Sequence, residues 1–329
     1  MLKITKPGIE TIVEDWPGRL GYLSKGMAAS GAMDNMSLQF ANLLVGNAIN
    51  EAGLEIAGGY FEAEFQKDTV MSLCGTDMKP TLNGSAIPMW ESVPVKQGDV
   101  LAVGVFGEFG FRSNLAVAGG FDVPAYLGSK STCIFGGYGG FHGRKLAAGD
   151  ILKMGEPLRN LDSLTGRKLK KQYLPQYSRV WELRAVPGPN TCPDYVTREG
   201  MDYLYEHEHK VQHTSNRSAY RIEPVPRYFF ARTDGGVGGS HPSNIVDHGY
   251  AIRGTMNVCG DTPILLIGDG PTLGGYINVL HVIYADLWKI GQGTPSRDKF
   301  KFTLCTREQA IEERRKQKAL YTEEAVTRG

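Results

Sequence analysis

The sequence has no hydrophobic run long enough to cross a membrane. A transmembrane helix needs about 20 consecutive apolar residues, and no stretch of the 329 residues approaches that length. The N-terminal segment, "MLKITKPGIETIVEDWPGR", also lacks the apolar core of a signal peptide. We therefore expect a soluble, cytoplasmic protein without a membrane partner. The length exceeds what one ordinary core needs and suits two domains.

The sequence also lacks an excess of charge of either sign. It has 36 Lys and Arg against 35 Asp and Glu, which gives a formal net charge of +1. A protein whose main partner is nucleic acid or an anionic surface usually carries a basic excess. The balance therefore argues against both partners.

Paired cysteines are missing as well. The five cysteines are odd in number and far apart, and no CxxC occurs. Neither a zinc knuckle nor a disulfide framework is indicated, so we expect free and mostly buried thiols. They are Cys74, Cys133, Cys192, Cys259 and Cys305.

Standard motifs for nucleotide, serine-hydrolase and zinc chemistry are absent. The glycine-rich segments 137–145, 233–241 and 268–276 match neither GxxxxGK[ST] nor a GxGxxG that opens a clear helix, and GxSxG does not occur. His209 and His213 have zincin-like spacing but lack the following glutamate, so surface histidines are the favoured interpretation. We expect neither a bound metal nor a nucleotide site on this chain.

What the sequence does contain is many short apolar runs between turn residues. Its 42 Gly and 17 Pro are spread evenly, a texture typical of a mainly β (α+β) protein. Three segments place an Asp at a turn before apolar residues, and each predicts entry into a strand that closes a sheet or barrel. They are "QGDVLAVG" from Gln97, "AGDILKMG" from Ala148 and "SRDKFKFT" from Ser296.

Helices are predicted at only three places. "DNMSLQFANLLVG" begins at Asp34, which can cap it, and "TREGMDYLYEHEH" begins at Thr197. The charged tail opens with a capping box of Thr306 and Gln309. The polar, basic segment 155–179 is the best linker candidate. We therefore predict domains over 1–160 and 161–305, followed by a charged C-terminal helix over 306–329.

Small polar residues gather at the glycine-rich turns and suit a polar, planar ligand held by hydrogen bonds. Near Ser30 and Asp34 a capped helix N-terminus could bind an anion or a carbonyl oxygen, although a simple capping turn is the more ordinary interpretation. Asp269 follows an apolar run and therefore stands at the predicted end of a strand. Its carboxylate could point outward to a ligand, or it could simply cap the turn.

Several motifs together resemble the allophanate hydrolase subunit 2 family, also known as the KipA-like or biotin-dependent carboxyltransferase family. The resemblance extends from about Pro7 to Phe302. Its markers are "GIETIVEDWPGRLGY", "SGAMDNMSLQFANLLVGN", "FRSNLAVAGGFDVPAYLGSKST", "TSNRSAYRIE" and "DGPTLGGY". It implies two cyclophilin-like β-barrel domains with few helices.

The late motif, "GDGPTLGGY", differs from the "DRQTTGGY" usual in the 5-oxoprolinase and KipA branch. With "RTDGGVGGSHPSN" and "ADLWKIGQ" it resembles the carboxyltransferase part of urea carboxylase. The resemblance implies transfer of CO2 from carboxybiotin to a small amide, with urea first and guanidine or another amide next. The alternatives are the C subunit of an ATP-dependent 5-oxoprolinase and a non-catalytic KipA-like regulator.

On this resemblance we expect catalytic roles for three residues and contacts to substrate or biotin from eight others. The catalytic candidates are Asp269, His241 and Asp234. The binding candidates are Asn216, Arg217, Asn244, Thr272, Gly274, Gly275, Ser30 and Asp34. We further expect His241, Asn244 and Asp269 to line one cleft.

The resemblance also implies partners, because the sequence has no biotin-attachment motif such as MKM and no ATP-grasp site. Carboxybiotin would be carried on a separate chain, and ATP would be used by a partner biotin carboxylase. A subunit resembling allophanate hydrolase subunit 1 or KipI would be a further separate protein. The isolated chain is expected to be inactive.

Overall fold

The computed structural model describes residues 1–232, 252–270, 272 and 275–328. The chain forms two compact units. Unit 1 consists of Met1–Leu20, Ala29–Tyr177 and Lys318–Gly329, and unit 2 of Gly21–Ala28 and Ser178–Gln317. The predicted domains were continuous ranges of sequence. Each observed unit instead includes a short segment that is distant in sequence from the other residues of that unit.

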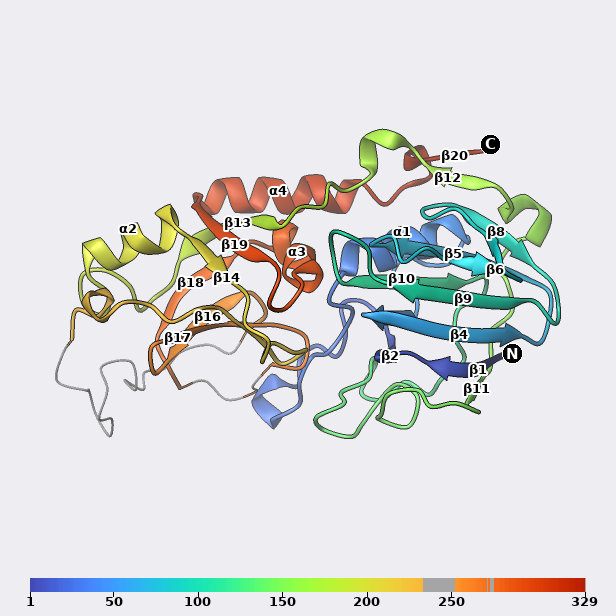
Figure 1. Ribbon diagram of the computed structural model, residues 1–329, viewed down its shortest axis with the longest axis horizontal. Coiled ribbons are helices and arrows are strands. Elements are labelled where there is room, and N and C mark those ends of the chain that lie inside the picture. Colours follow the sequence, from blue (N-terminus) through green and yellow to red (C-terminus); the bar gives the residue numbers. More distant parts are fainter. Residues whose placement is uncertain (233–251, 271, 273–274, 329) are drawn as a thin grey trace. The chain divides into compact units, whose positions relative to one another are not determined.

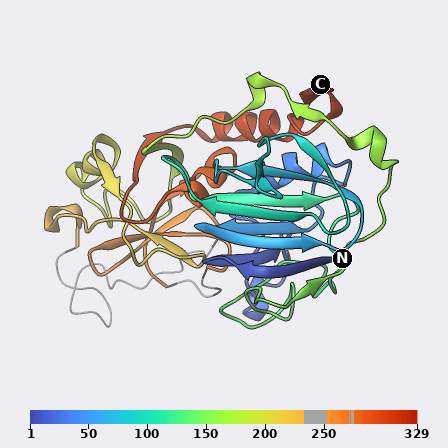
Figure 2. The same cartoon turned by 45° about the vertical axis from the view of Figure 1, so that its right-hand side comes forward.

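Unit 1 contains two antiparallel sheets (Figure 1; the blue, cyan and green arrows in Figure 2). The six-stranded sheet has the order β11 (Ile151–Leu152), β1 (Leu2–Pro7), β4 (Gly59–Phe65), β9 (Val100–Val105), β6 (Thr81–Leu82) and β7 (Ser85–Ala86). The five-stranded sheet has the order β2 (Glu10–Glu14), β3 (Gly53–Ala57), β10 (Arg112–Val117), β5 (Thr69–Gly75) and β8 (Ser92–Val95). A short ribbon pairs β12 (Arg167–Leu169) with β20 (Val326–Arg328).

Burial along the strands shows how unit 1 is layered. β4 alternates between buried and more exposed residues, as expected for a strand with one face on a core. Every residue of β5 and β10 is buried, because helix α1 (Asn35–Leu44) packs on these two strands as well. One core is shared by side chains of both sheets, among them Phe61, Phe65, Leu73 and Leu115.

Unit 2 is built on one seven-stranded sheet. Its order is β14 (Glu208–Lys210), β19 (Lys299–Leu304), β13 (Val180–Pro187), β18 (Asn278–Val282), β16 (Thr255–Cys259), β17 (Thr262–Leu266) and β15 (Ala219–Arg221). β13 and β19 run parallel, and the other neighbours are antiparallel. α2 (Arg198–Glu206) packs against β19, and α3 (Leu287–Gln292) packs against β13.

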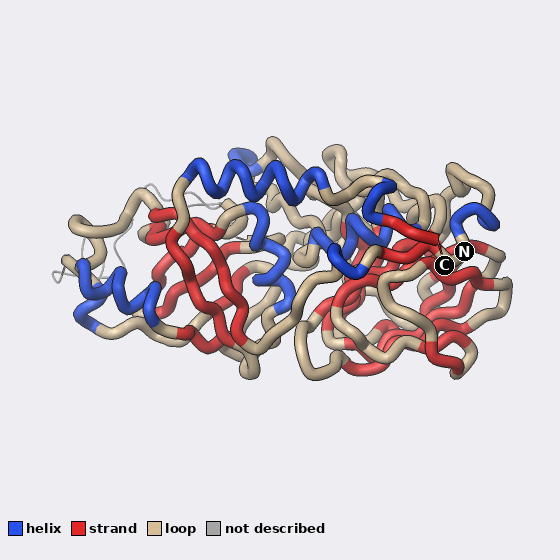
Figure 3. Tube along the Cα trace, turned by 90° about the horizontal axis from the view of Figure 1, so that it is seen from above, coloured by secondary structure: helices blue, strands red, loops and turns tan. Residues whose placement is uncertain are grey.

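The mainly β prediction is confirmed, and strands and loops make up most of the described chain (Figure 3). Within the part that the structure describes, the sheets are open, and none is closed into the expected barrel. The three predicted helices form as α1, α2 and α4 (Arg307–Ala319). The α4 capping box is confirmed, since Thr306 N donates to Gln309 Oε1 at 2.7 Å and Gln309 N to Thr306 Oγ1 at 3.2 Å.

Three smaller findings complete the fold. α3 was not predicted, because its six residues, "LWKIGQ", include a glycine and are too few to show a helical period. All five thiols are free, with Cys74 and Cys133 buried and the others partly exposed. None of the helices in the described ranges has the length and apolarity that a membrane span requires.

Candidate functional site

Pairing of β15 with β17 brings Arg217 next to Asp269 in unit 2. Ala219 lies opposite Leu266 in the ladder, and beyond it Asp269 N donates a hydrogen bond to Arg217 O at 3.0 Å. The side chains then meet, with Arg217 Nε 3.3 Å from Asp269 Oδ2. Two candidates 52 positions apart are thus joined by backbone and side chain.

The pair is almost completely removed from solvent. The Arg217 side chain is 4% exposed and that of Asp269 is 2% exposed. Asp269 Oδ1 has no hydrogen-bond partner among the described residues. A buried carboxylate oxygen without a donor is costly, so such an atom marks a place where an N–H or O–H group can be accepted.

The turn after Asp269 remains close to the sheet. Gly270 N donates to Ile267 O at 2.8 Å, and a Cβ on Gly270 would lie 2.8 Å from that same oxygen. Gly270 therefore has to be a glycine for the chain to turn here.

Two further predicted binding residues, Thr272 and Gly275, follow this turn. Thr272 is partly exposed, and a Cβ on Gly26 would lie 4.0 Å from its Oγ1. Around the Cβ position of Gly275 there is open space within 4 Å.

Three asparagines fix the strand that follows the turn, and the sequence did not reveal them as a group. The Asn257 side-chain amide donates to Asn278 Oδ1 and to the carbonyl of Tyr276. Asn278 N donates to Asn190 Oδ1 at 2.9 Å, and Asn190 N returns a bond to Asn278 O at 3.0 Å. The register shifts at Asn257, as at a β-bulge beside a functional site. Asparagine is depleted in strands, so Asn257 and Asn278 were the available signal.

Two titratable groups with shifted pKa values lie in β18 or just before it, namely His281 and Tyr276. His281 of β18 is within hydrogen-bond distance of Thr255, with 3.1 Å between its Nδ1 and Thr255 Oγ1, and burial lowers its pKa. A hydrogen bond with the Cys259 thiol raises the pKa of Tyr276. Both effects favour the neutral forms at neutral pH.

Asn216 has a local structural role. It is exposed, and its Oδ1 accepts hydrogen bonds from Ser218 N at 2.9 Å and Ala219 N at 3.3 Å. This arrangement stabilises the turn that leads into β15. Its predicted contact to a ligand stays a prediction.

Ser30 and Asp34 lie in unit 1, whereas Arg217 and Asp269 lie in unit 2. Asp34 caps α1, because its Oδ1 accepts from Ser37 N at 3.0 Å and its Oδ2 accepts from Ser37 Oγ. The capping interpretation is therefore confirmed for Asp34. Ser30 is buried with a φ of 55°, in the left-handed region.

Four candidates lie outside the described residues. They are Asp234, His241, Asn244 and Gly274. The expected cleft of His241, Asn244 and Asp269 therefore stays a prediction.

The closely spaced histidines do not share one environment. His207 and His213 are exposed, but His209 is fully buried on β14. The ring Nε2 of His209 lies 2.9 Å from Leu204 O, which can only accept, so Nε2 carries the proton. Burial lowers the pKa of His209 despite this bond. The surface interpretation predicted for His209 and His213 is therefore confirmed for His213 and wrong for His209, and within the described ranges no cluster suited to a metal occurs.

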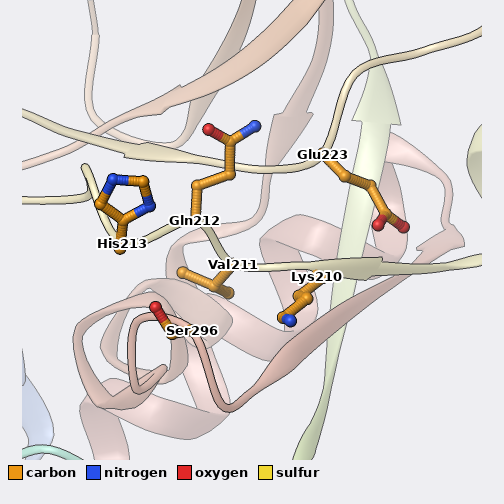
Figure 4. A pocket seen from close by; sticks show the side chains of 6 residues that line it. All are labelled: Lys210, Val211, Gln212, His213, Glu223 and Ser296. Carbon is orange, nitrogen blue, oxygen red and sulfur yellow. The ribbon is translucent and has the colours of Figure 1, made fainter.

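A separate pocket of about 210 Å³ lies elsewhere in unit 2. Its lining consists of Lys210, Val211, Gln212, His213, Glu223 and Ser296. Figure 4 shows the His213 ring and the Glu223 carboxylate at opposite ends, so the polar groups do not converge on one point. A ligand site needs convergent polar groups, and we therefore centre the candidate site on Arg217 and Asp269.

Comparison with known proteins supports a single family. The family model for the carboxyltransferase domain, subdomain A and B, matches residues 25–304. A putative urea carboxylase of Emericella nidulans is 38% identical over 302 residues, which are 92% of this chain and 24% of that protein. The chain thus spans about a quarter of the length of this fungal relative.

A bacterial relative and a solved structure agree with this match. The 5-oxoprolinase C subunit of Escherichia coli is 33% identical over 324 residues, 98% of this chain and 96% of that protein. The crystal structure of the Kluyveromyces lactis urea carboxylase superimposes with a TM-score of 0.90 at 34% identity, over 100% of this chain and 30% of that chain. The chain belongs to the carboxyltransferase domain family that urea carboxylases and the 5-oxoprolinase C subunit share.

Proposed function

We propose that this chain is one subunit of a urea carboxylase-type, biotin-dependent carboxyltransferase that acts on a small amide such as urea or guanidine. The observation that carries the proposal is the buried Arg217–Asp269 pair, in which Asp269 Oδ1 has no partner among the described residues. The similarity to urea carboxylases supports the reaction class.

The residues present fit both reactants. Urea, guanidine and the ureido ring of biotin all present N–H groups, and a carboxylate accepts such groups in charge-assisted hydrogen bonds. Carboxybiotin, when bound, supplies an activated carboxyl group. Asp269 would orient an N–H donor, and Arg217, 3.3 Å away, would hold the Asp269 carboxylate in position.

The buried charge also bears on which substrate the site would prefer. A carboxylate in a poorly solvated site binds a cation more strongly than a neutral molecule, but Arg217 already compensates this charge. The remaining oxygen is therefore a hydrogen-bond acceptor more than an unpaired charge. This arrangement favours urea first and guanidine second.

The test is an assay of the assembled complex. The chain is co-expressed with a KipI-like subunit, a biotin carboxylase and a biotin carrier, and bicarbonate-dependent ATP turnover is measured with urea, guanidine and 5-oxoproline. We expect Asp269→Asn to lower turnover about 10²-fold, the scale of a lost electrostatic group. Asp261→Asn is the matched control, because Asp261 is an exposed turn aspartate on the same sheet. Full turnover in folded Asp269→Asn would refute the site.

A specific observation favours a second candidate. The match to the E. coli 5-oxoprolinase C subunit extends over 96% of that protein's own length, at 33% identity. ATP hydrolysis that depends on 5-oxoproline, without biotin, would establish this alternative. Binding to a sensor kinase, with no turnover in any complex, would instead support the KipA-like regulator.

The isolated chain is expected to be inactive, since carboxybiotin and ATP are handled by other chains in this proposal. Calorimetry with Mg-ATP on the purified protein should show no binding. Micromolar affinity would contradict this part of the proposal.

A further inference from the structure

The segment 275–277 leads from the Asp269 turn into β18 and presents its backbone to open space. Around the Cβ position of Gly275 nothing lies within 4 Å, so a ligand can approach this backbone closely. The Gly275 N–H makes no hydrogen bond to another of the described residues. Tyr276 beside it is 36% exposed. The segment therefore offers a backbone donor on its open side.

Asn257 of β16 holds this segment from the side of the sheet. Its Nδ2 donates to Asn278 Oδ1. The same Nδ2 lies 3.4 Å from Tyr276 O and 3.5 Å from Ile277 O. The Tyr276 hydroxyl is hydrogen-bonded to the thiol of Cys259, which is also on β16. One strand thus contacts the segment through both its backbone and its side chain.

A β-bulge brings the two asparagines together. Met256 pairs with Leu280, so a regular ladder would place Asn257 opposite Val279. The register shifts at this point, and Asn257 pairs with Asn278 instead. Neighbouring residues of a strand point to opposite faces, so without the shift the two amides would not face each other. Bulges often re-aim a side chain beside a functional site.

Asn278 is in turn fixed by the chain that follows β13. Its N–H donates to Asn190 Oδ1 at 2.9 Å, and Asn190 N donates to Asn278 O at 3.0 Å. A Cβ on Gly188 would lie 2.2 Å from Asn278 O, so this chain packs directly on β18. Asn190, Asn257 and Asn278 are 5%, 6% and 1% exposed. The three amides therefore support the segment from inside the protein.

Buried amides are a costly way to build a strand. Asparagine is depleted in strands, and an amide removed from water has to recover the hydrogen bonds that it loses. An aliphatic residue at position 257 would suit the strand better, but it would give the Tyr276 carbonyl no donor. A connected polar network specifies one arrangement of the chain. The network is therefore suited to placing residues 275–277.

We propose that Asn257 is a positioning residue, which holds the Gly275 N–H where it donates to the carbonyl oxygen of a planar amide substrate. Asn257 acts through the Tyr276 carbonyl and does not touch the substrate. Asp269 Oδ1 offers an acceptor for a substrate N–H at the start of the turn, and Gly275 offers a donor at its end. The inference rests on the proposed function and deepens its substrate assignment.

This donor distinguishes urea from guanidine. Urea has a carbonyl oxygen that accepts a hydrogen bond, whereas a guanidinium group presents only N–H donors. A site built to bond one group of its substrate rejects an analogue that lacks this group, because the site's own polar group is then left unpaired. Loss of the Asn257 amide should therefore affect urea much more than guanidine.

The test uses the assembled complex with urea and guanidine. We expect Asn257→Ala to raise KM for urea about 10-fold, the scale of one hydrogen bond in a binding site, with kcat within about threefold. For guanidine, KM, or the inhibition constant if it is not turned over, should change by less than about twofold. Asn257→Gln keeps the amide donor and should recover part of the affinity for urea.

Hydrogen exchange of the purified chain is a second measurement that does not depend on activity. We expect the amides of residues 275–278 to exchange about 10-fold faster in Asn257→Ala. Asn42→Ala is the matched control, because Asn42 is a buried asparagine of unit 1 whose Nδ2 donates to Glu51 O at 2.7 Å. It should lower the melting temperature but leave both substrates and the exchange at 275–278 unchanged. Asn257→Val, which suits a strand, replaces Asn257→Ala if that variant does not fold.

The outcomes separate this inference from the proposed function. Equal changes for urea and guanidine, or an unchanged KM for urea, would overturn the inference and leave the proposed function standing. Unchanged exchange at 275–278 would overturn the positioning role whatever the activity. No turnover of any amide by the wild-type complex would overturn the proposed function and the specificity role together.

Discussion

Asp34 and Asp269 are both buried aspartates that stand at turns, yet their surroundings differ. Asp34 in unit 1 has both carboxylate oxygens bonded to one residue of its own helix, Ser37. Asp269 in unit 2 is bonded to Arg217 through one oxygen, while the other has no partner among the described residues. A saturated carboxylate stabilises its element, whereas an incompletely saturated one retains capacity to bind a ligand. The residue type and the turn position are the same for Asp34 and Asp269, so the sequence alone did not show which of them could bind a ligand.

The largest expected effect is on Asp269. Asp269→Ala leaves the Arg217 guanidinium buried without its carboxylate, and breaking such a pair costs roughly 3–5 kcal/mol. Chemical unfolding should show this loss, and Arg217→Met with Asp269→Leu should recover most of it. Asp269→Asn should also show a clear decrease in melting temperature, because Asn cannot compensate the charge of the buried arginine.

A smaller loss is expected from Asp34→Ala. Removing a helix N-cap costs about 1–2 kcal/mol, and the complete burial of Asp34 favours the upper end. Asp34→Asn should be milder, since asparagine also caps helices. Turnover of the folded complex should remain unchanged. A loss of turnover comparable to that of Asp269→Asn would remove the distinction between the two aspartates.

The next effect is on pH dependence and concerns the core of unit 2. Burial lowers the pKa of His209 below its unfolded value, so the unfolded chain takes up the proton first. Stability from this group is complete above about pH 6.5 and is lost as pH falls below it. Melting temperature should therefore decrease between pH 7.5 and 5.5, and by less in His209→Gln. An equal decrease in both proteins would contradict the assignment.

The smallest effect is expected at the exposed cap of α4. Thr306→Ala removes the hydroxyl that accepts from Gln309 N, and an exposed cap contributes about 0.5–1 kcal/mol. The measurement is thermal unfolding beside Asp34→Ala. A larger loss of stability in Thr306→Ala than in Asp34→Ala would show that the burial of a capping residue does not determine how much it stabilises its helix.

Local sequence patterns were enough to predict many of the helices and strands. Asp34 and Gly46 delimit a helix pattern that forms α1 almost residue for residue, and the Gly-Asp turn at Gly98 leads into β9 as predicted. α3 was missed because so few residues show no period. Among site residues, Arg217 and Asp269 were both named from the sequence, but their ion pair was not. The pair depends on β15 meeting β17, a register that no local pattern contains.

The sequence by itself determined most of the element types, the absence of nucleotide and zinc motifs, and the resemblance to a carboxyltransferase family. These features depend on neighbouring residues, where turn chemistry, capping and period act over a few positions. Only the tertiary structure decided that Asn190, Asn257 and Asn278 form one network and that His209 is buried. Burial and long-range pairing depend on what the rest of the chain places nearby, and that information is distributed over the whole sequence.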